Sequence, residues 1–131
     1  MMVRTYGSAQ EFLSDAQGFL EQEEAVNNLM LGICFRLVQS PESAESTPYF
    51  ATVSDRGRVT SAAVMTPPRP LLLYGDADDV PAIARNLLDN RWNLGSTMGP
   101  AGIAKSFAET WTAMAGVALA GMEHQGGRRG V

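Results

Sequence analysis

Side chains that could act as catalytic acids, bases or metal ligands are few in this chain and far apart in its sequence. His124 is the only histidine and Cys34 the only cysteine. A zinc site needs several such ligands, and a Ser-His arrangement needs a further group to orient the histidine, so His124 beside Glu123 supports neither. We expect a solvated histidine and a cysteine that packs in the core. The sequence therefore predicts no catalytic residue and no metal site.

A group of carboxylates forms an acidic turn, Gly75-Asp76-Ala77-Asp78-Asp79, directly after the apolar residues 71–74. If a strand ends there and a helix follows, the free amide groups at the helix start favour an anion such as phosphate. A carboxylate about 4 to 6 Å from a phosphate charge would instead cost roughly 3 to 4 kcal/mol at an effective dielectric constant near 20. The turn is therefore predicted to repel the ligand that its position would otherwise favour.

Three uncharged polar side chains are also candidates for a site. Tyr74 precedes the acidic turn and could serve as a general acid near a thiolate, but a packed ring with its hydroxyl in water is the expected role. Asn27 and Asn28 are poor helix formers within an apolar helical stretch. We expect one of them to face solvent and the other to bond a loop backbone.

The composition sets the class of protein that must position these residues. The chain has 131 residues, of which 45% are hydrophobic and 18% charged, with a formal net charge of −4. Such a chain folds as one domain, here predicted for residues 1–122 with a flexible tail at residues 123–131. The negative charge disfavours nucleic acid and anionic membranes. No apolar run is long enough for a membrane helix or a signal peptide, so we expect a cytoplasmic protein.

The first half of the chain predicts a strand, two helices and a hairpin. A strand is expected at residues 2–6, and Ser8 with Glu11 forms a capping box that starts a helix. A second helix begins among Glu21, Glu23 and Glu24 and ends before Pro41, with its buried face predicted from an apolar stripe of Val26, Leu29, Met30, Ile33 and Leu37. Residues 49–54 and 58–65 read as strands of an antiparallel hairpin, because Gly57 suits the turn between them.

The second half alternates strands and helices. Residues 71–74 predict a short interior strand, approached through three prolines that cannot donate to a sheet. A helix follows with Asp78 or Asp79 as its cap. A weaker strand is expected at residues 92–98, and Gly99-Pro100 predicts the start of a helix whose core face carries Ile103, Phe107, Trp111 and Met114 and which ends at Gly116. Residues 117–122 complete the order β-α-α-β-β-β-α-β-α-β with one more strand.

Several blocks of the sequence resemble a known family. The order of elements is similar to that of the GNAT N-acetyltransferase fold, and "EEAVNNLMLGI", "ATVSDRGRVTSAAVMTPPRPLLL" and "GPAGIAKSFAETWTAMAG" resemble the amino-terminal half of bacterial GNAT-family proteins that have two halves. The resemblance covers about residues 3 to 122. It implies a three-layer α/β/α domain with a mixed, mostly antiparallel central sheet. It also implies a degenerate half, since the second half of such proteins carries the acetyl-CoA signature.

In working GNAT domains a turn of pattern Gln/Arg-x-x-Gly-x-Gly/Ala follows the strand that corresponds to residues 71–74, and its amides bind the pyrophosphate of coenzyme A. Here the acidic turn stands in that place, so we expect no cofactor on this chain alone, although the resemblance implies acetyl-CoA for the family. The pattern does occur at residues 4–9, from Arg4 to Ala9. That match lies on the wrong strand and is interpreted as a coincidence, with Ser8 serving as a helix cap.

The resemblance also indicates a candidate substrate site and a function. The second helix of GNAT folds borders the acceptor cleft, and residues 66–68 correspond to the place where two central strands separate. Asn27, Asn28, Thr66 and Pro67 are therefore the candidate substrate-binding residues. The predicted function is a noncatalytic GNAT-like domain that supports dimerisation or substrate binding, with a homodimer or a catalytic GNAT half as partner. The alternatives are an active acetyl-CoA-dependent N-acetyltransferase with an atypical cofactor loop and a small-ligand-binding domain.

Overall fold

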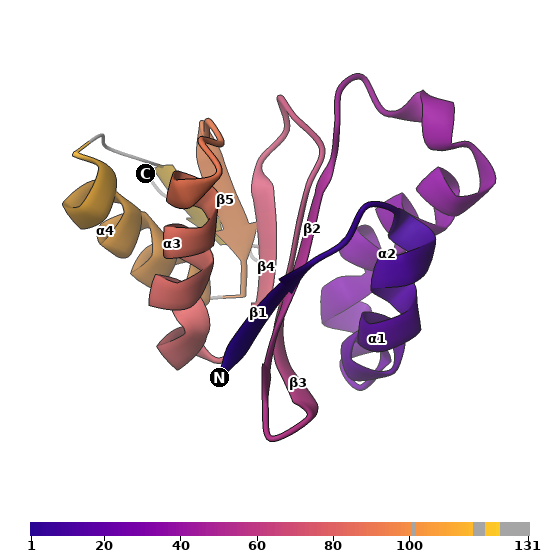
Figure 1. Cartoon of the computed structure of the whole chain (residues 1–131), viewed down its shortest axis with the longest axis horizontal. Coiled ribbons are helices and arrows are strands. Elements are labelled where there is room, and N and C mark those ends of the chain that lie inside the picture. Colours follow the sequence, from indigo (N-terminus) through magenta and orange to yellow (C-terminus); the bar gives the residue numbers. More distant parts are fainter. Residues whose placement is uncertain (101, 117–119, 124–131) are drawn as a thin grey trace.

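The computed structural model describes residues 1–100, 102–116 and 120–123 as helices, strands and connecting turns of an α/β fold (Figure 1). The strands are β1 (Met2–Thr5), β2 (Tyr49–Asp55), β3 (Arg58–Met65), β4 (Leu71–Gly75), β5 (Ser96–Gly99) and β6 (Ala120–Glu123). The α-helices are α1 (Ala9–Glu21), α2 (Glu24–Gln39), α3 (Val80–Asp89) and α4 (Ile103–Ala115), with short 3-10 turns η1 (Pro41–Ser43) and η2 (Ala77–Asp79). The predicted alternation of elements is confirmed in these residues.

The six strands form one mixed sheet in the order β1-β2-β3-β4-β5-β6. The first four strands pair antiparallel, whereas β4 with β5 and β5 with β6 pair parallel. The β4–β5 pairing extends over two positions only, Leu71 with Thr97 and Leu72 with Met98. The remainder of β4, which leads to the acidic turn, therefore has no ladder partner on its β5 side.

Two apolar cores lie on opposite faces of this sheet. Figure 1 shows α1 and α2 on one side and α3 and α4 on the other. On the α1 and α2 side, Phe12 and Leu20 pack with Phe50 and Val64 from the strands. On the α3 and α4 side the cluster includes Ile83, Leu87, Phe107 and Trp111. Period-two alternation along β2 and β3 supplies both faces, as expected of strands buried between two helical layers.

Local sequence signals account for several element boundaries. Ser8 is the N-cap of α1, and its Oγ accepts the amide of Glu11 at 3.2 Å. The β2–β3 turn places Arg56 and Gly57 at φ of 56° and 78°, the double positive φ of a tight hairpin. Gly116 ends α4 in the left-handed region at φ 76°. The Ser8 cap, the Gly57 turn and the Gly116 helix end are confirmed. The predicted capping box is confirmed in part, because in the described residues Ser8 accepts the Glu11 amide but the Glu11 side chain does not bond the Ser8 amide in return.

The predicted face of α2 is partly wrong. Leu29, which was assigned to the core, is 47% exposed, whereas Asn27 is 3% exposed and lies in the core layer beside Met30 and Cys34. The helix is apolar on nearly every side, so its hydrophobic pattern does not identify one buried face. A hydrogen bond decides the orientation, since Asn27 Nδ2 donates to the carbonyl of Leu20 at 2.9 Å.

The segment between α3 and α4 also differs from the prediction. Trp92 was expected in a strand, but its amide donates to the carbonyl of Leu87 and Arg91 adopts φ 61°, which together close the end of α3. The strand β5 is therefore shorter than residues 92–98. Helix α4 begins at Ile103 and not at Pro100, because Gly99 still belongs to the sheet and Gly102, at φ 102°, turns the chain into the helix.

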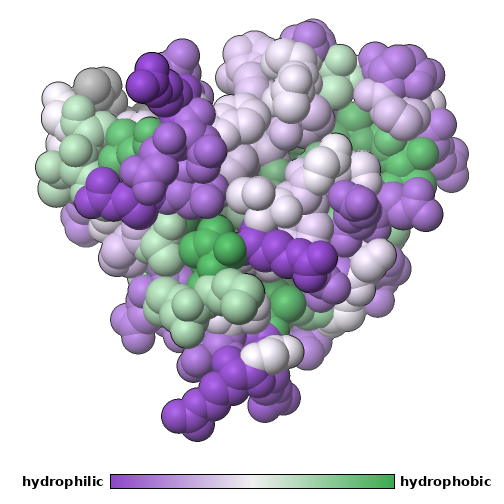
Figure 2. Space-filling model, viewed as in Figure 1, coloured by the Kyte–Doolittle hydropathy of each residue, from purple (hydrophilic) through white to green (hydrophobic). Residues whose placement is uncertain are grey.

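The molecular surface is mixed in polarity (Figure 2), and the C-terminal region includes the last strand of the sheet. Figure 2 shows separate hydrophobic patches among hydrophilic residues on the face that it displays. Within the described residues, no helix has the length and apolar character to cross a membrane. The last predicted strand is seen as β6 at its described residues. Positions 117–119 of that prediction, and 124–131 of the predicted tail, lie outside the described residues.

Candidate functional site

A cleft of about 430 Å³ opens where β4 and β5 separate, at their carboxyl ends. It lies between the end of α1, the acidic turn and the start of α4. The residues that line it are Phe19, Thr60, Tyr74, Gly75, Ala77, Pro100, Gly102 and Ile103. None of these described lining residues is basic. Crevices at the carboxyl ends of parallel strands are common ligand sites in α/β folds, so this cleft is the candidate site.

Gly75 fixes the acidic turn tightly against the neighbouring strand β3. It adopts φ 138°, and a Cβ at this position would lie 2.4 Å from both the Ser61 Oγ and the Thr60 carbonyl oxygen. Only glycine tolerates this conformation and this approach. The chain therefore reaches the turn with its backbone held against Thr60 and Ser61, and the geometry of the cleft wall depends on a residue without a side chain.

Two aspartates of the turn bind groups of the protein itself. Asp79 is 4% exposed, and its Oδ2 accepts hydrogen bonds from the hydroxyls of Thr60 and Ser61, each at 2.6 Å. Asp76 accepts the amide of Asp78 at 2.9 Å through Oδ1. The amide of Asp76 in turn donates to the Ser61 Oγ at 3.0 Å. A buried carboxylate needs such donors, and the polar groups of β3 supply them.

This arrangement refines two predictions about the turn. Asp79 is the N-cap residue of α3 but makes no side-chain cap hydrogen bond, because its carboxylate points back to β3. The side chain that satisfies an amide at the start of the turn is that of Asp76. Of the three carboxylates, one is buried against β3, one binds a turn amide and one, that of Asp78, belongs to an exposed residue. The predicted carboxylates are present, but that of Asp79 points to β3 and not to the start of the helix.

Tyr74 and Phe19 form an aromatic wall of the cleft. Their ring centroids lie 5.3 Å apart with the planes tilted by 55°. Burial raises the pKa of the Tyr74 phenol, and the negative charge of Glu23 raises it further. The phenol is therefore protonated at neutral pH and could donate a proton or a hydrogen bond. The described lining residues offer no carboxylate, histidine or thiol to act with it.

The structure distributes the predicted substrate-binding residues over different environments. Asn27 is buried at the junction of α1 and α2, whereas Asn28 is exposed. Asn28 faces solvent as expected of one of the pair, whereas Asn27 bonds the carbonyl of Leu20 in the last turn of α1 and not a loop backbone. Thr66 and Pro67 precede β4, at the end where β4 and β5 are paired, and not at the end where they separate. They line smaller hollows beside α2, and a ligand role for the four residues stays a prediction.

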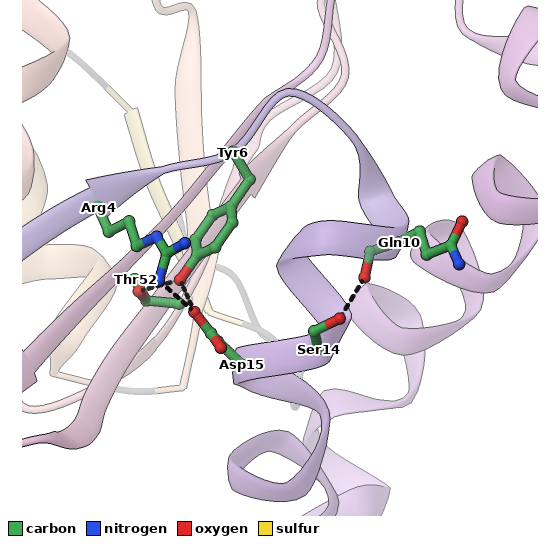
Figure 3. A network of polar contacts seen from close by, with 6 residues as sticks. All are labelled: Arg4, Tyr6, Gln10, Ser14, Asp15 and Thr52. Atoms are coloured by element: carbon green, nitrogen blue, oxygen red, sulfur yellow. Dashed lines mark hydrogen bonds and ion pairs between the residues drawn. The ribbon is translucent and has the colours of Figure 1, made fainter.

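The stretch from Arg4 to Ala9 belongs to a network that joins β1, α1 and β2, shown in Figure 3. Tyr6 donates its hydroxyl hydrogen to Asp15 Oδ2 at 2.7 Å, so the Thr52 hydroxyl, 2.9 Å away, donates to Tyr6. Arg4 forms an ion pair with Asp15 at 3.1 Å and lies over the Tyr6 ring. Burial is the main cause that raises the pKa of Tyr6. Ser8 caps α1 as predicted, and these contacts have a structural role, since they hold the segment after β1 against α1 and β2.

Sequence reasoning did not identify most of the cleft. Thr60 and Ser61 were assigned only to a hairpin strand, and Phe19 was not singled out. The one signal that could have pointed to Thr60 and Ser61 is this pair of neighbouring hydroxyl residues on β3, the strand before the one that leads to the acidic turn. Their role depends on the register that pairs Ser61 with Gly75, which the sequence does not contain.

Comparison of the chain with family models, curated proteins and solved structures finds no match and identifies no family for it. Its site must therefore be interpreted from its own chemistry.

Burial raises the pKa of the Cys34 thiol to about 12, so this residue is a protonated part of the core. In the ranges that the structure covers, no group of three or more acidic, histidine or cysteine residues could hold a metal ion.

Proposed function

We propose that this chain is a noncatalytic GNAT-like domain of an acetyltransferase-type protein, which supports substrate binding or dimerisation and does not transfer acyl groups itself. The order of elements and the helical layers on both sides of a mixed sheet are compatible with a GNAT-like arrangement. The separation of β4 and β5 leaves a cleft where such a domain would place its cofactor. The proposal combines this architecture with the chemistry of the cleft.

The observation that carries the proposal is the acidic turn at the start of α3. A diphosphate would need free backbone amides and positive charge there. The turn offers three aspartates, one of which already binds the amide of Asp78. The cleft residues include no arginine or lysine in the described chain. The aspartates would therefore repel the negative diphosphate of the cofactor, and no basic lining residue would balance its charge.

The cleft also lacks the groups for amine acylation. The acceptor amine must lose a proton, and the thiolate of coenzyme A must be stabilised or protonated as it leaves. Tyr74 could protonate a thiolate, but the described lining residues provide no general base. A domain with this cleft can shape or hold a substrate, whereas the acid and base work would belong to another domain or chain.

An acetyl-transfer assay tests the proposal directly. The purified chain is incubated with acetyl-CoA and a panel of primary amines, and released thiol is measured over time. We expect release at the uncatalysed rate for the native chain and for Tyr74→Phe. Multiple turnovers by the native chain that fall with Tyr74→Phe would show that the domain is an enzyme and would reject the proposal.

A second candidate function is the binding of a small uncharged or cationic molecule in the same cleft. It is favoured by the aromatic wall of Phe19 and Tyr74 beside an opening of about 430 Å³. Pantetheine, which has the thiol arm of coenzyme A without its diphosphate, is a suitable probe. Tighter binding of pantetheine than of coenzyme A would support this candidate, and equal absence of both would reject it for thiol-arm ligands.

A further inference from the structure

A second hollow, of about 210 Å³, lies at the opposite end of β4 from the cleft. Its sheet side is formed by Val64 of β3, Leu72 of β4 and Met98 of β5, and its helix side by Leu29 and Ile33 of α2. The connection between β3 and β4 closes its rim with Thr66, Arg69 and Pro70. It shares no lining residue with the cleft, so it is a separate feature of the fold.

The lining of this hollow is apolar, and part of it stays open to solvent. Leu29 is 47% exposed although it contributes to the wall, and Met98 is half-buried in the sheet. An exposed leucine alone is ordinary in a folded protein. Here it stands beside an open depression that has five apolar side chains from three strands and a helix, which is the composition of a small-molecule pocket.

Positive charge lies at the rim of the hollow. Arg69 also lines an adjoining depression of about 60 Å³ together with Arg36, Glu45 and Thr66. The ion pairs of the described chain involve Arg4 and the N-terminal amine, and neither Arg36 nor Arg69 takes part in one. Around the hollow and the adjoining depression there are thus two arginines that form no ion pair in the described chain and one glutamate, Glu45. The local charge is positive in a chain of net charge −4 and complements an anion.

We propose that this hollow binds a small amphiphilic carboxylate, with its apolar body against Leu29, Leu72 and Met98 and its carboxylate on Arg69. A dry cavity of about 150 Å³ holds benzene, so about 210 Å³ accommodates an aromatic ring or a short alkyl chain. A guanidinium binds a carboxylate through two parallel hydrogen bonds, and the Thr66 hydroxyl is a further donor at the rim. The site does not depend on the function proposed for the cleft.

Nuclear magnetic resonance of the isotope-labelled chain can locate and measure this binding, with benzoate as the anionic probe and benzamide as its uncharged match. We expect benzoate to shift the amide signals of Ile33, Thr66 and Leu72 and to bind more tightly than benzamide. Arg69→Gln should weaken benzoate binding by about tenfold or more, because it removes a charge-assisted hydrogen bond, and should leave benzamide unaffected. The matched control is Arg85→Gln, on the exposed side of α3 across the sheet.

A variant that fills the hollow provides an independent check. Leu29→Trp adds bulk at an exposed rim residue and should abolish the binding of both probes while the spectrum stays that of the folded chain. The proposal is overturned if benzoate causes no shift at about 10 mM, which would saturate a site of millimolar affinity. It is also overturned if benzoate and benzamide bind with equal affinity, or if the Arg69→Gln variant binds benzoate like the native chain. Amide shifts confined to Tyr74 and Gly75 would overturn it as well. The proposal is also overturned if dilution of the chain without probe shifts the same amide signals, because a second copy of the chain would then occupy the hollow.

Discussion

Ser61 is the residue that connects the sheet to the acidic turn. Its hydroxyl donates to Asp79 and accepts the amide of Asp76, so one oxygen satisfies a buried carboxylate and a turn amide. Thr60 supplies the second donor to Asp79. The carboxylate of Asp79 is therefore a structural group that holds the start of α3 on β3. The aspartates of one turn, which look equivalent in the sequence, differ in function because only one is buried.

Substitution of the buried aspartate should show this difference in stability. Asp79→Ala removes two charge-assisted hydrogen bonds from a buried site, and we expect a loss of about 2 to 3 kcal/mol in the free energy of unfolding. Asp78→Ala, at an exposed position one residue earlier, should change it by less than about 0.5 kcal/mol. Urea unfolding of both variants measures the difference. Equal effects would mean that Asp79 is not anchored to Thr60 and Ser61.

At the scale of elements, boundaries set by one or two residues could be predicted from the sequence. Ser8, Gly57 and Gly116 each act through their own backbone or side chain, and all three behave as predicted. Features that depend on a distant partner could not be predicted. The face of α2 is chosen by the bond from Asn27 to Leu20, and the wall of the cleft by the register of β3 on β4. The same limit applies to the candidate site, because Thr60 and Phe19 enter it only through tertiary contacts.

The two neighbouring asparagines of α2 offer a matched test of this packing. Asn27→Ala removes the hydrogen bond that joins α2 to the end of α1 and leaves the carbonyl of Leu20 without this donor. It should therefore destabilise the fold by about 1 to 2 kcal/mol. Asn28→Ala replaces an exposed residue by a better helix former and should be neutral or slightly stabilising. Chemical denaturation of the pair gives both values. A destabilising Asn28→Ala with a neutral Asn27→Ala would reverse the assigned orientation of the helix.

At the scale of the whole molecule, the sheet ends in two edge strands, β1 and β6. An edge strand presents unpaired amides and carbonyls to other chains. β1 is tied to α1 by Arg4, Tyr6 and Asp15. β6 pairs with β5 on one side only within the described sheet, and we propose its other side as the edge for association with a second copy or another domain.

We predict a homodimer through β6 with roughly 1,200 Å² or more buried in total. Sedimentation equilibrium at micromolar concentration should give twice the 14.1 kDa mass of the chain. A lysine in an edge strand opposes pairing, so Ala120→Lys should produce the monomer. Thr5→Lys, on the other edge, is the control and should leave the dimer intact. A native species of 14.1 kDa would contradict the prediction.

We propose that the turn after β4 excludes the diphosphate of acetyl-CoA. Isothermal titration calorimetry with acetyl-CoA tests it most directly. The variant with Asp76→Asn and Asp78→Asn keeps Asp79 on β3 and should bind more tightly than the native chain. Asp89→Asn, at the far end of α3, makes the same type of charge change and should have no effect. We predict that the native chain binds acetyl-CoA with a dissociation constant weaker than about 10 μM, or roughly −7 kcal/mol, and a native constant below that value would contradict the account.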